Sequence, residues 1–198
     1  MKKALLLALA LCAASVFAQG SPPPMRLRGT IEKVDPTTLV VRERNGQTMT
    51  LAIADNFAVS EVMAVDPAMI QSGAFVGTAA VTGADGKLAA LEVLVFPEAM
   101  RGTGEGHSQW DLQPGSTMTN ATVTEVVPGA KGREMTLRYK DGEKTIVVPE
   151  GIPVVTLKPS DRSLLVPGAK VLVIAQVRDG TPTALRAIAG RNGFAPPM

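Results

Sequence analysis

Residues 28–34, RGTIEKV, return as NATVTEV at residues 120–126, and this repetition decides the fold. The match continues in order along the chain, because LVVR at 39–42 corresponds to MTLR at 135–138. The offset between partners stays between 92 and 96, and it changes at expected turns, where insertions are tolerated. An ordered match of this kind indicates a duplicated structural unit.

Each copy reads as short strands with one helical turn. Residues 66–74 (DPAMIQSGA) match residues 161–169 (DRSLLVPGA), where Asp is typical of a helix N-cap and Gly of a stop. Apolar and polar residues alternate in the segment 135–140, which is the period of a strand with one buried face. Asn-Gly at 45–46 and Asp-Gly at 141–142 predict hairpins with type I′ turns.

These patterns predict an all-β protein made of two tandem small OB-like β-barrels, each with one short helical turn. Closure into a barrel hides the strand edges of a unit of only ~75 residues. A two-sheet sandwich for each unit is the alternative. The expected boundaries are a signal peptide at 1–18, a first barrel at 25–97, a Gly-rich linker at 98–116, a second barrel at 117–190 and a C-terminal tail at 191–198.

The N-terminal segment is typical of a secretory signal peptide. Lys2 and Lys3 precede an apolar stretch that ends in Val16-Phe17-Ala18, which predicts cleavage after Ala18. The stretch is shorter than the ~20 residues of a membrane span. Leu11 is bulky for a lipidation motif, so we do not expect a lipid anchor at Cys12. We therefore expect a periplasmic or secreted protein without a membrane span.

Cleavage would change the charge of the chain. Without Lys2 and Lys3, the 20 basic residues fall to 18 and equal the 18 acidic ones. A neutral protein with few aromatic residues (4%) lacks the basic surface that nucleic acid requires. Cys12 is the only cysteine, so the mature part would have neither a disulfide nor thiolate chemistry.

The layout resembles a family of exported bacterial small β-barrel domains of unknown function. The resemblance lies in Gly-Thr-Ile at 29–31, in Gly73 before Ala-Phe-Val at 74–76, and in Gly86 followed by Ala-Leu-Glu-Val at 90–93. The linker from Met100 to His107, continuing through residues 110–121, resembles a tandem-repeat branch that sometimes carries the label of a metal ABC transporter permease. The resemblance implies the fold and export, and it implies no activity and no site residues.

The linker carries the only His and the only Trp of the chain. His107 with Glu105 and Asp111 offers nitrogen and oxygen ligands that transition metals accept, although no cofactor is required by the sequence. The alternative is structural: Trp110 packs over the seam between the barrels and His107 hydrogen-bonds to backbone. Met100, Arg101 and Trp110 are then interface residues.

The function expected from these observations is non-enzymatic binding or adaptor activity in the periplasm, with a protein or small ligand as partner. A metal-handling protein that uses His107 is the first alternative. A hydrolase with an unrecognised carboxylate site is the second, although no G-x-S-x-G motif is present. The glycines at 102, 104 and 106 lack the strand, loop and helix context of a phosphate-binding loop.

Overall fold

The computed structural model describes residues 23–130 and 132–198, so the expected signal peptide, its cleavage site and Cys12 lie outside the described residues. Within these residues the chain is all-β, with four single-turn 3-10 helices, and no helix is long and apolar enough to cross a membrane. The elements are β1 Met25–Val34, β2 Thr38–Glu43, β3 Thr48–Ala64, η1 Pro67–Met69, β4 Phe75–Thr82, β5 Leu88–Ala90, β6 Val93–Val95, η2 Glu98–Met100, β7 Gly106–Gln109, β8 Thr117–Gly129, β9 Gly132–Tyr139, β10 Gly142–Pro149, β11 Val154–Ser160, η3 Arg162–Leu164, β12 Lys170–Arg178, β13 Thr181–Ala189 and η4 Arg191–Gly193.

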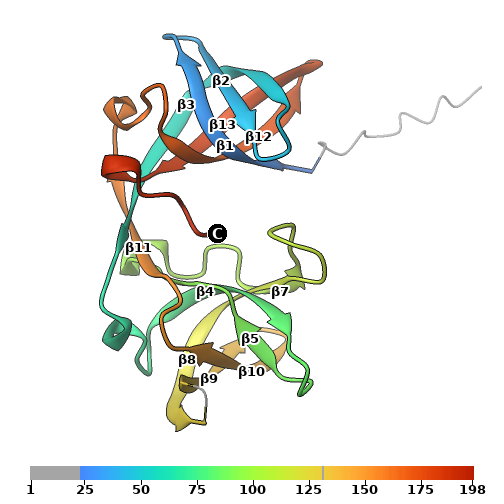
Figure 1. Cartoon of the computed structure of the whole chain (residues 1–198), viewed down its shortest axis with the longest axis vertical. Coiled ribbons are helices and arrows are strands. Elements are labelled where there is room, and N and C mark those ends of the chain that lie inside the picture. The colour runs from blue at the N-terminus through green and yellow to red at the C-terminus, as the bar shows by residue number, and fades with distance from the viewer. Residues whose placement is uncertain (1–22, 131) are drawn as a thin grey trace, which may run out of the picture.

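Two closed five-stranded barrels are joined by shared strands (Figure 1). The first barrel consists of β1, β2, β3, β12 and β13, and the parallel pair β13–β3 closes it. The second consists of β4, β5, β8, β9 and β10, and it contains the corresponding parallel pair β10–β5. Within the first repeat β1 to β5 are strands 1 to 5, and within the second repeat β8, β9, β10, β12 and β13 are strands 1 to 5. In this numbering both barrels have the same order, with strand 3 beside strand 5 and strand 4 beside strand 1. This is an OB-like barrel, so the sandwich alternative is wrong.

Each barrel is assembled from both repeats, which corrects the expected domain boundaries. The first barrel takes three strands from residues 25–64 and two from residues 170–189, whereas the second takes β4 and β5 from the first repeat and β8 to β10 from the second. The cause lies in β3, which is 17 residues long and carries the chain out of the first barrel. One turn at η1 then delivers β4 to the other barrel. The arrangement is a domain swap within one chain.

The two crossing strands pair with each other about a pseudo-two-fold axis. The far end of β3 runs antiparallel to β11, and Val62 faces Leu157 in the register. These two residues occupy the same position in their repeats, because they are separated by the same 95 residues as the caps Asp66 and Asp161. A residue that pairs with its own repeat partner lies on the axis that relates the two halves.

Three apolar clusters hold the molecule together. One fills the first barrel around Ile31 and Leu51, and one fills the second around Met135 and Ile146. The third lies between the barrels, where Val62 and Leu157 are buried. The inter-barrel junction is therefore a core in its own right, with apolar surface removed from water.

The short-range predictions hold in part. Asp66 accepts from the Ala68 amide at 2.7 Å and Asp161 from the Ser163 amide at 2.8 Å, which confirms the two capped turns. Both hairpins also form, but neither has a type I′ turn. Gly46 alone has a positive φ (88°) in the first, and the second turns at residues 140–141, one residue earlier than expected.

Candidate functional site

A cavity of about 140 Å³ lies between the barrels. The first barrel contributes a wall of two rows, which the strand register defines. The first row crosses β1, β12 and β13 and contains Arg26, Ile174 and Arg186. The second row lies two residues further along the same strands and contains Arg28, Leu172 and Ile188. We call these six residues the first wall. Its middle is apolar and its edges carry three guanidinium groups.

The second barrel presents the equivalent positions. Met118 faces Ala79 across β8 and β4, and the amide of Ala79 donates to Glu92 Oε1 at 2.9 Å. The next row contains Asn120, Gly77 and Leu94. We call these six residues the second wall. The two walls are repeat partners position by position, so the cavity lies on the pseudo-two-fold axis.

Gly77 allows close packing against β4 in the second wall. A Cβ added there would lie 2.5 Å from Asn120 Oδ1 and 3.0 Å from Phe96 Cε2, distances that real Cβ contacts do not show or rarely show. The repeat partner of Gly77 in the first wall is Leu172. The absence of a side chain at residue 77 therefore lets the Asn120 amide and the Phe96 ring approach β4.

Three buried polar atoms have no hydrogen-bond partner among the residues that the structure describes. They are Glu92 Oε2, Asn120 Oδ1 and Trp110 Nε1, and all three residues line this cavity. An unsatisfied buried polar atom costs about 1–3 kcal/mol. Three such atoms belong to residues that line one apolar cavity, which makes this cavity the strongest candidate site among the described residues.

Glu92 is held in this position by a break in the fifth strand of its barrel. The strand divides into β5 and β6 at residues 91–92, and the Thr78 hydroxyl donates to the Glu92 carbonyl at 2.6 Å. The side chain is 1% exposed, and desolvation raises the pKa of its carboxyl from 4.5 to about 7. The bond from the Ala79 amide opposes this rise only in part.

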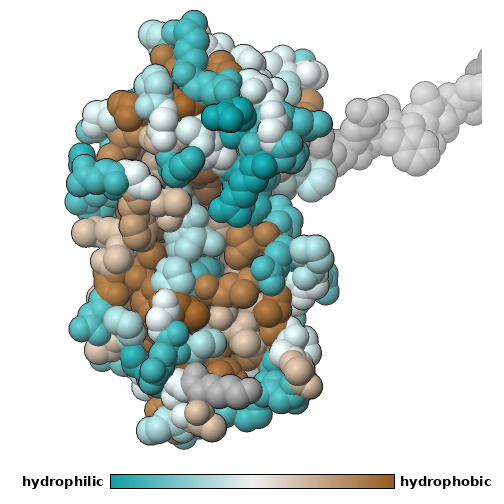
Figure 2. Space-filling view, viewed as in Figure 1, coloured by the Kyte–Doolittle hydropathy of each residue, from teal (hydrophilic) through white to brown (hydrophobic). Residues whose placement is uncertain are grey.

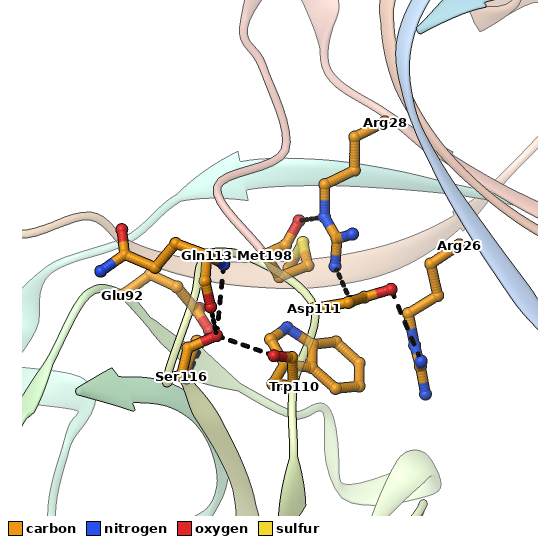
Figure 3. A network of polar contacts seen from close by, with 9 residues as sticks. Arg26, Arg28, Glu92, Trp110, Asp111, Gln113, Ser116 and Met198 are labelled. Atoms are coloured by element: carbon orange, nitrogen blue, oxygen red, sulfur yellow. Dashed lines mark hydrogen bonds and ion pairs between the residues drawn. The ribbon is translucent and has the colours of Figure 1, made fainter. Parts of the chain in front are cut away.

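The loop after β7 covers the cavity from one side (Figure 3). The Arg26 guanidinium lies 4.0 Å from the centre of the Trp110 ring, and Arg28 donates to Asp111 at 2.8 Å and to the backbone oxygen of Met198 at 3.0 Å. Inside the loop, the Ser116 hydroxyl donates to the Trp110 carbonyl at 2.9 Å. Cation–π contact and ion pairing thus fasten the loop to the first wall.

The three residues of the expected metal set do not converge. His107 Nδ1 lies 2.8 Å from Thr119 Oγ1, Glu105 accepts from the Lys140 amide, and Asp111 pairs with the first wall. No cluster of three His, Cys, Asp or Glu residues suited to a metal occurs in the described part of the chain. Burial lowers the pKa of His107, and the charge of Lys144 adds to this.

The interface residues have different outcomes. Trp110 and Met100 line the cavity between the barrels, as the structural interpretation of the linker expects. Arg101 pairs instead with Glu98 at 2.6 Å and donates to the Gly73 carbonyl. The bond of His107 goes to the Thr119 side chain rather than to backbone.

Sequence reasoning missed Glu92, Asn120 and Arg186. A signal was present, because Ala-Leu at 90–91 matches Ala-Leu at 184–185 and the next residues are Glu92 and Arg186. The two copies therefore differ by carrying opposite charges at equivalent positions of an otherwise apolar strand. The exchange of strands, which brings these residues to one cavity, could not be inferred from the repeats alone.

A larger hollow of about 370 Å³ lies beside Arg42 and Lys170, and both of these side chains are already paired. Arg42 contacts Glu32 at 3.0 Å, and Lys170 donates to Thr30 at 2.8 Å. The smaller inter-barrel cavity is the stronger candidate, because it combines an apolar lining with unsatisfied buried groups.

Comparison with protein-family models, with curated proteins and with solved structures found no significant match. The resemblance to the exported β-barrel family therefore stays a prediction. The fold class and the candidate site rest on the residues of this chain.

Proposed function

We propose that the protein is a non-enzymatic binding protein of the bacterial cell envelope that holds a small amphipathic molecule between its two barrels. The observation that carries this proposal is the set of three unpartnered polar atoms in one apolar cavity, at Glu92, Trp110 and Asn120. Two are acceptors while Glu92 is ionised, and the indole N–H is a donor. A ligand with an apolar body and a polar end would satisfy them.

The size of the cavity limits the ligand. An engineered apolar cavity of ~150 Å³ in another protein binds benzene, so about 140 Å³ suits a molecule of similar bulk. The apolar part of the ligand would contact Leu94, Leu157 and Ile188, which line the same space. Small volume and an apolar lining favour a compact aliphatic or aromatic molecule over a sugar or a nucleotide.

The lining supports binding rather than covalent catalysis. Glu92 is the one carboxylate in it, and the lining holds no Ser, Cys, His or Lys that could act as a nucleophile beside it. The lining therefore offers no side-chain nucleophile for a covalent intermediate. The metal-handling alternative has no comparable set of converging ligands among the described residues. Export is supported only by the sequence of residues 1–18.

Trp110 provides a direct test, because it is the only tryptophan and lines the cavity. We expect its emission to change with saturation when the chain from residue 19 is titrated with isoamyl alcohol, benzyl alcohol or isoamylamine. Ile174→Phe, which places a ring in the cavity, should abolish the response. Val127→Phe on an exposed part of β8 should leave it intact. A response that is unchanged in Ile174→Phe would contradict the proposal, and so would the absence of a response both with these three probes and with leucine.

A further inference from the structure

We propose that the ligand is a zwitterion of amino-acid size, with its carboxylate toward Arg186 and its ammonium group toward Glu92 and Asn120. This inference rests on the proposed binding function and deepens it. It follows from the unequal neutralisation of charge on the two walls.

The first wall carries three arginines, and two of them share the single carboxylate of Asp111. Asp111 lies 2.8 Å from Arg28 and 3.8 Å from Arg26. The side chain of Arg186 has no ion pair and no hydrogen bond among residues 23–130 and 132–198, although the residue lines the cavity. Its cross-strand neighbour is Ile174, so the surroundings on the wall are apolar. A guanidinium stays protonated in proteins, and its planar donors fit a carboxylate.

The second wall presents acceptors instead. Glu92 Oε2 and Asn120 Oδ1 lack partners, and both side chains flank β4 at neighbouring positions, Ala79 and Gly77. The remaining atoms of these two groups are already engaged, because Glu92 Oε1 accepts from Ala79 and Asn120 Nδ2 donates to the Thr103 carbonyl at 3.0 Å. A group with several N–H donors would satisfy both oxygens. An ammonium group has three such donors.

The walls carry opposite charges at one pair of equivalent positions. Arg186 and Glu92 are repeat partners, so they approach the cavity from opposite sides of the pseudo-two-fold axis. Trp110 Nε1 adds a further unpartnered donor that a carboxylate oxygen could accept. A small molecule with separated charges and an apolar middle matches this distribution, whereas a neutral molecule would leave both charges unpaired in an apolar space.

The protonation of Glu92 gives the inference a second readout. Burial, opposed in part by the bond from the Ala79 amide, raises the pKa of its carboxyl to about 7, and a bound ammonium would lower that pKa by favouring the charged form. Binding near pH 6 should therefore release a proton. Calorimetry in two buffers with different ionisation enthalpies measures that release.

The test uses four probes of one shape: leucine, isoamylamine without the carboxylate, isocaproate without the ammonium, and isoamyl alcohol without either charge. Each is titrated into the chain from residue 19 with Trp110 emission and calorimetry as readouts. Leucine should bind at least about tenfold more tightly than the other three, with proton release at pH 6. One charged hydrogen bond of ~1.5–3 kcal/mol corresponds to a change of this size.

Arg186→Gln should weaken leucine binding at least about tenfold and leave isoamylamine within about twofold. The control is Arg178→Gln at the exposed end of β12, which should change neither. If isoamyl alcohol or isoamylamine binds as tightly as leucine, or if Arg186→Gln has no effect on leucine, the zwitterion inference is wrong and the binding function stands. If none of the four probes binds and the earlier probes also fail, both proposals are wrong.

Discussion

The two barrels share one strand order but differ in the fifth strand. In the first barrel β13 is one strand of nine residues with a β-bulge at Leu185, whereas its counterpart in the second barrel is divided into β5 and β6 at residues 91–92. The core positions remain apolar in both copies, as with Val93 and Ala187. Among the positions that face the cavity, Leu94 and Ile188 are also both apolar, but Glu92 in one copy corresponds to Arg186 in the other.

The two copies therefore share the barrel scaffold, and they differ in side chains that line the cavity between the barrels. Two identical walls would bring like charges or identical side chains together at the pseudo-two-fold axis. In this chain one wall is cationic, and the other has an acceptor pair beside Gly77. Figure 2 shows apolar surface in the middle of the molecule, below the hydrophilic face of the first barrel.

The largest expected effect concerns the exchange of strands between the repeats. A protease site inserted after Gly102, in the exposed turn after η2, allows the repeats to be cut apart. Because each barrel contains strands from both repeats, the two fragments should remain one folded particle until both barrels unfold. Size-exclusion chromatography with light scattering measures this before and after cleavage, with the uncut insertion variant as control. Separation of the fragments under native conditions would show that each repeat forms its own barrel.

The next effect tests the charge difference between the walls through Glu92→Gln. The folded-state pKa of Glu92 is raised from 4.5 to about 7, so the folded protein binds the proton more tightly than the unfolded chain. The contribution of Glu92 to wild-type stability is therefore greatest below pH 4.5, falls as the pH rises through 7, and is about 3 kcal/mol lower above it. Glutamine does not titrate. The stability of Glu92→Gln relative to wild type should rise by about 3 kcal/mol between pH 4 and pH 8 in urea unfolding.

The control for that experiment is Glu61, the other buried glutamate. Glu61 is 5% exposed, and it pairs with Arg191 at 3.0 Å and with Lys158 at 3.3 Å. Glu61→Gln should destabilise the protein at pH 8, because it breaks both ion pairs, whereas Glu92→Gln should stabilise it there. If the two variants change stability in the same direction at pH 8, Glu92 is not an unpaired buried carboxylate.

A smaller effect on stability is expected from a substitution at Gly77, where Asn120 packs closely against β4. Gly77→Ala places a methyl group 2.5 Å from Asn120 Oδ1, and overpacking of this kind costs about 2 kcal/mol. Thermal unfolding measures the loss. Asn120→Ala removes the oxygen, so the double variant should recover part of it. Equal losses in the single and double variants would show that the close approach is not the reason for glycine at this position.

The sequence predicted the elements of this fold better than their assembly. The caps at Asp66 and Asp161 and the strand alternation around Met135 and Leu137 depend on neighbouring residues, which a single sequence displays. The exchange of strands depends on whether β3 turns back or continues, and a continuous strand has the same local pattern in both cases. Glu92 and Asn120 become neighbours only through that tertiary arrangement. Rarity of residue type singles out His107 and Trp110, of which only Trp110 lines the cavity, whereas Glu92 and Asn120 are of common residue types.

The smallest expected effect concerns the contact between the loop and the first wall. Asp111 is the shared ion-pair partner of Arg26 and Arg28. Its side chain is 48% exposed, and solvent screens ion pairs of this kind. Asp111→Asn should therefore cost less than about 1 kcal/mol of stability. Its consequence should be seen at Trp110 instead, because an unneutralised Arg28 no longer holds the loop against the wall and water reaches the indole. A red shift of Trp110 emission with an almost unchanged melting temperature is the expected result, with Asp141→Asn in the β9–β10 turn as control. A large loss of stability without a shift would mean that the loop supports the barrels rather than covers the cavity.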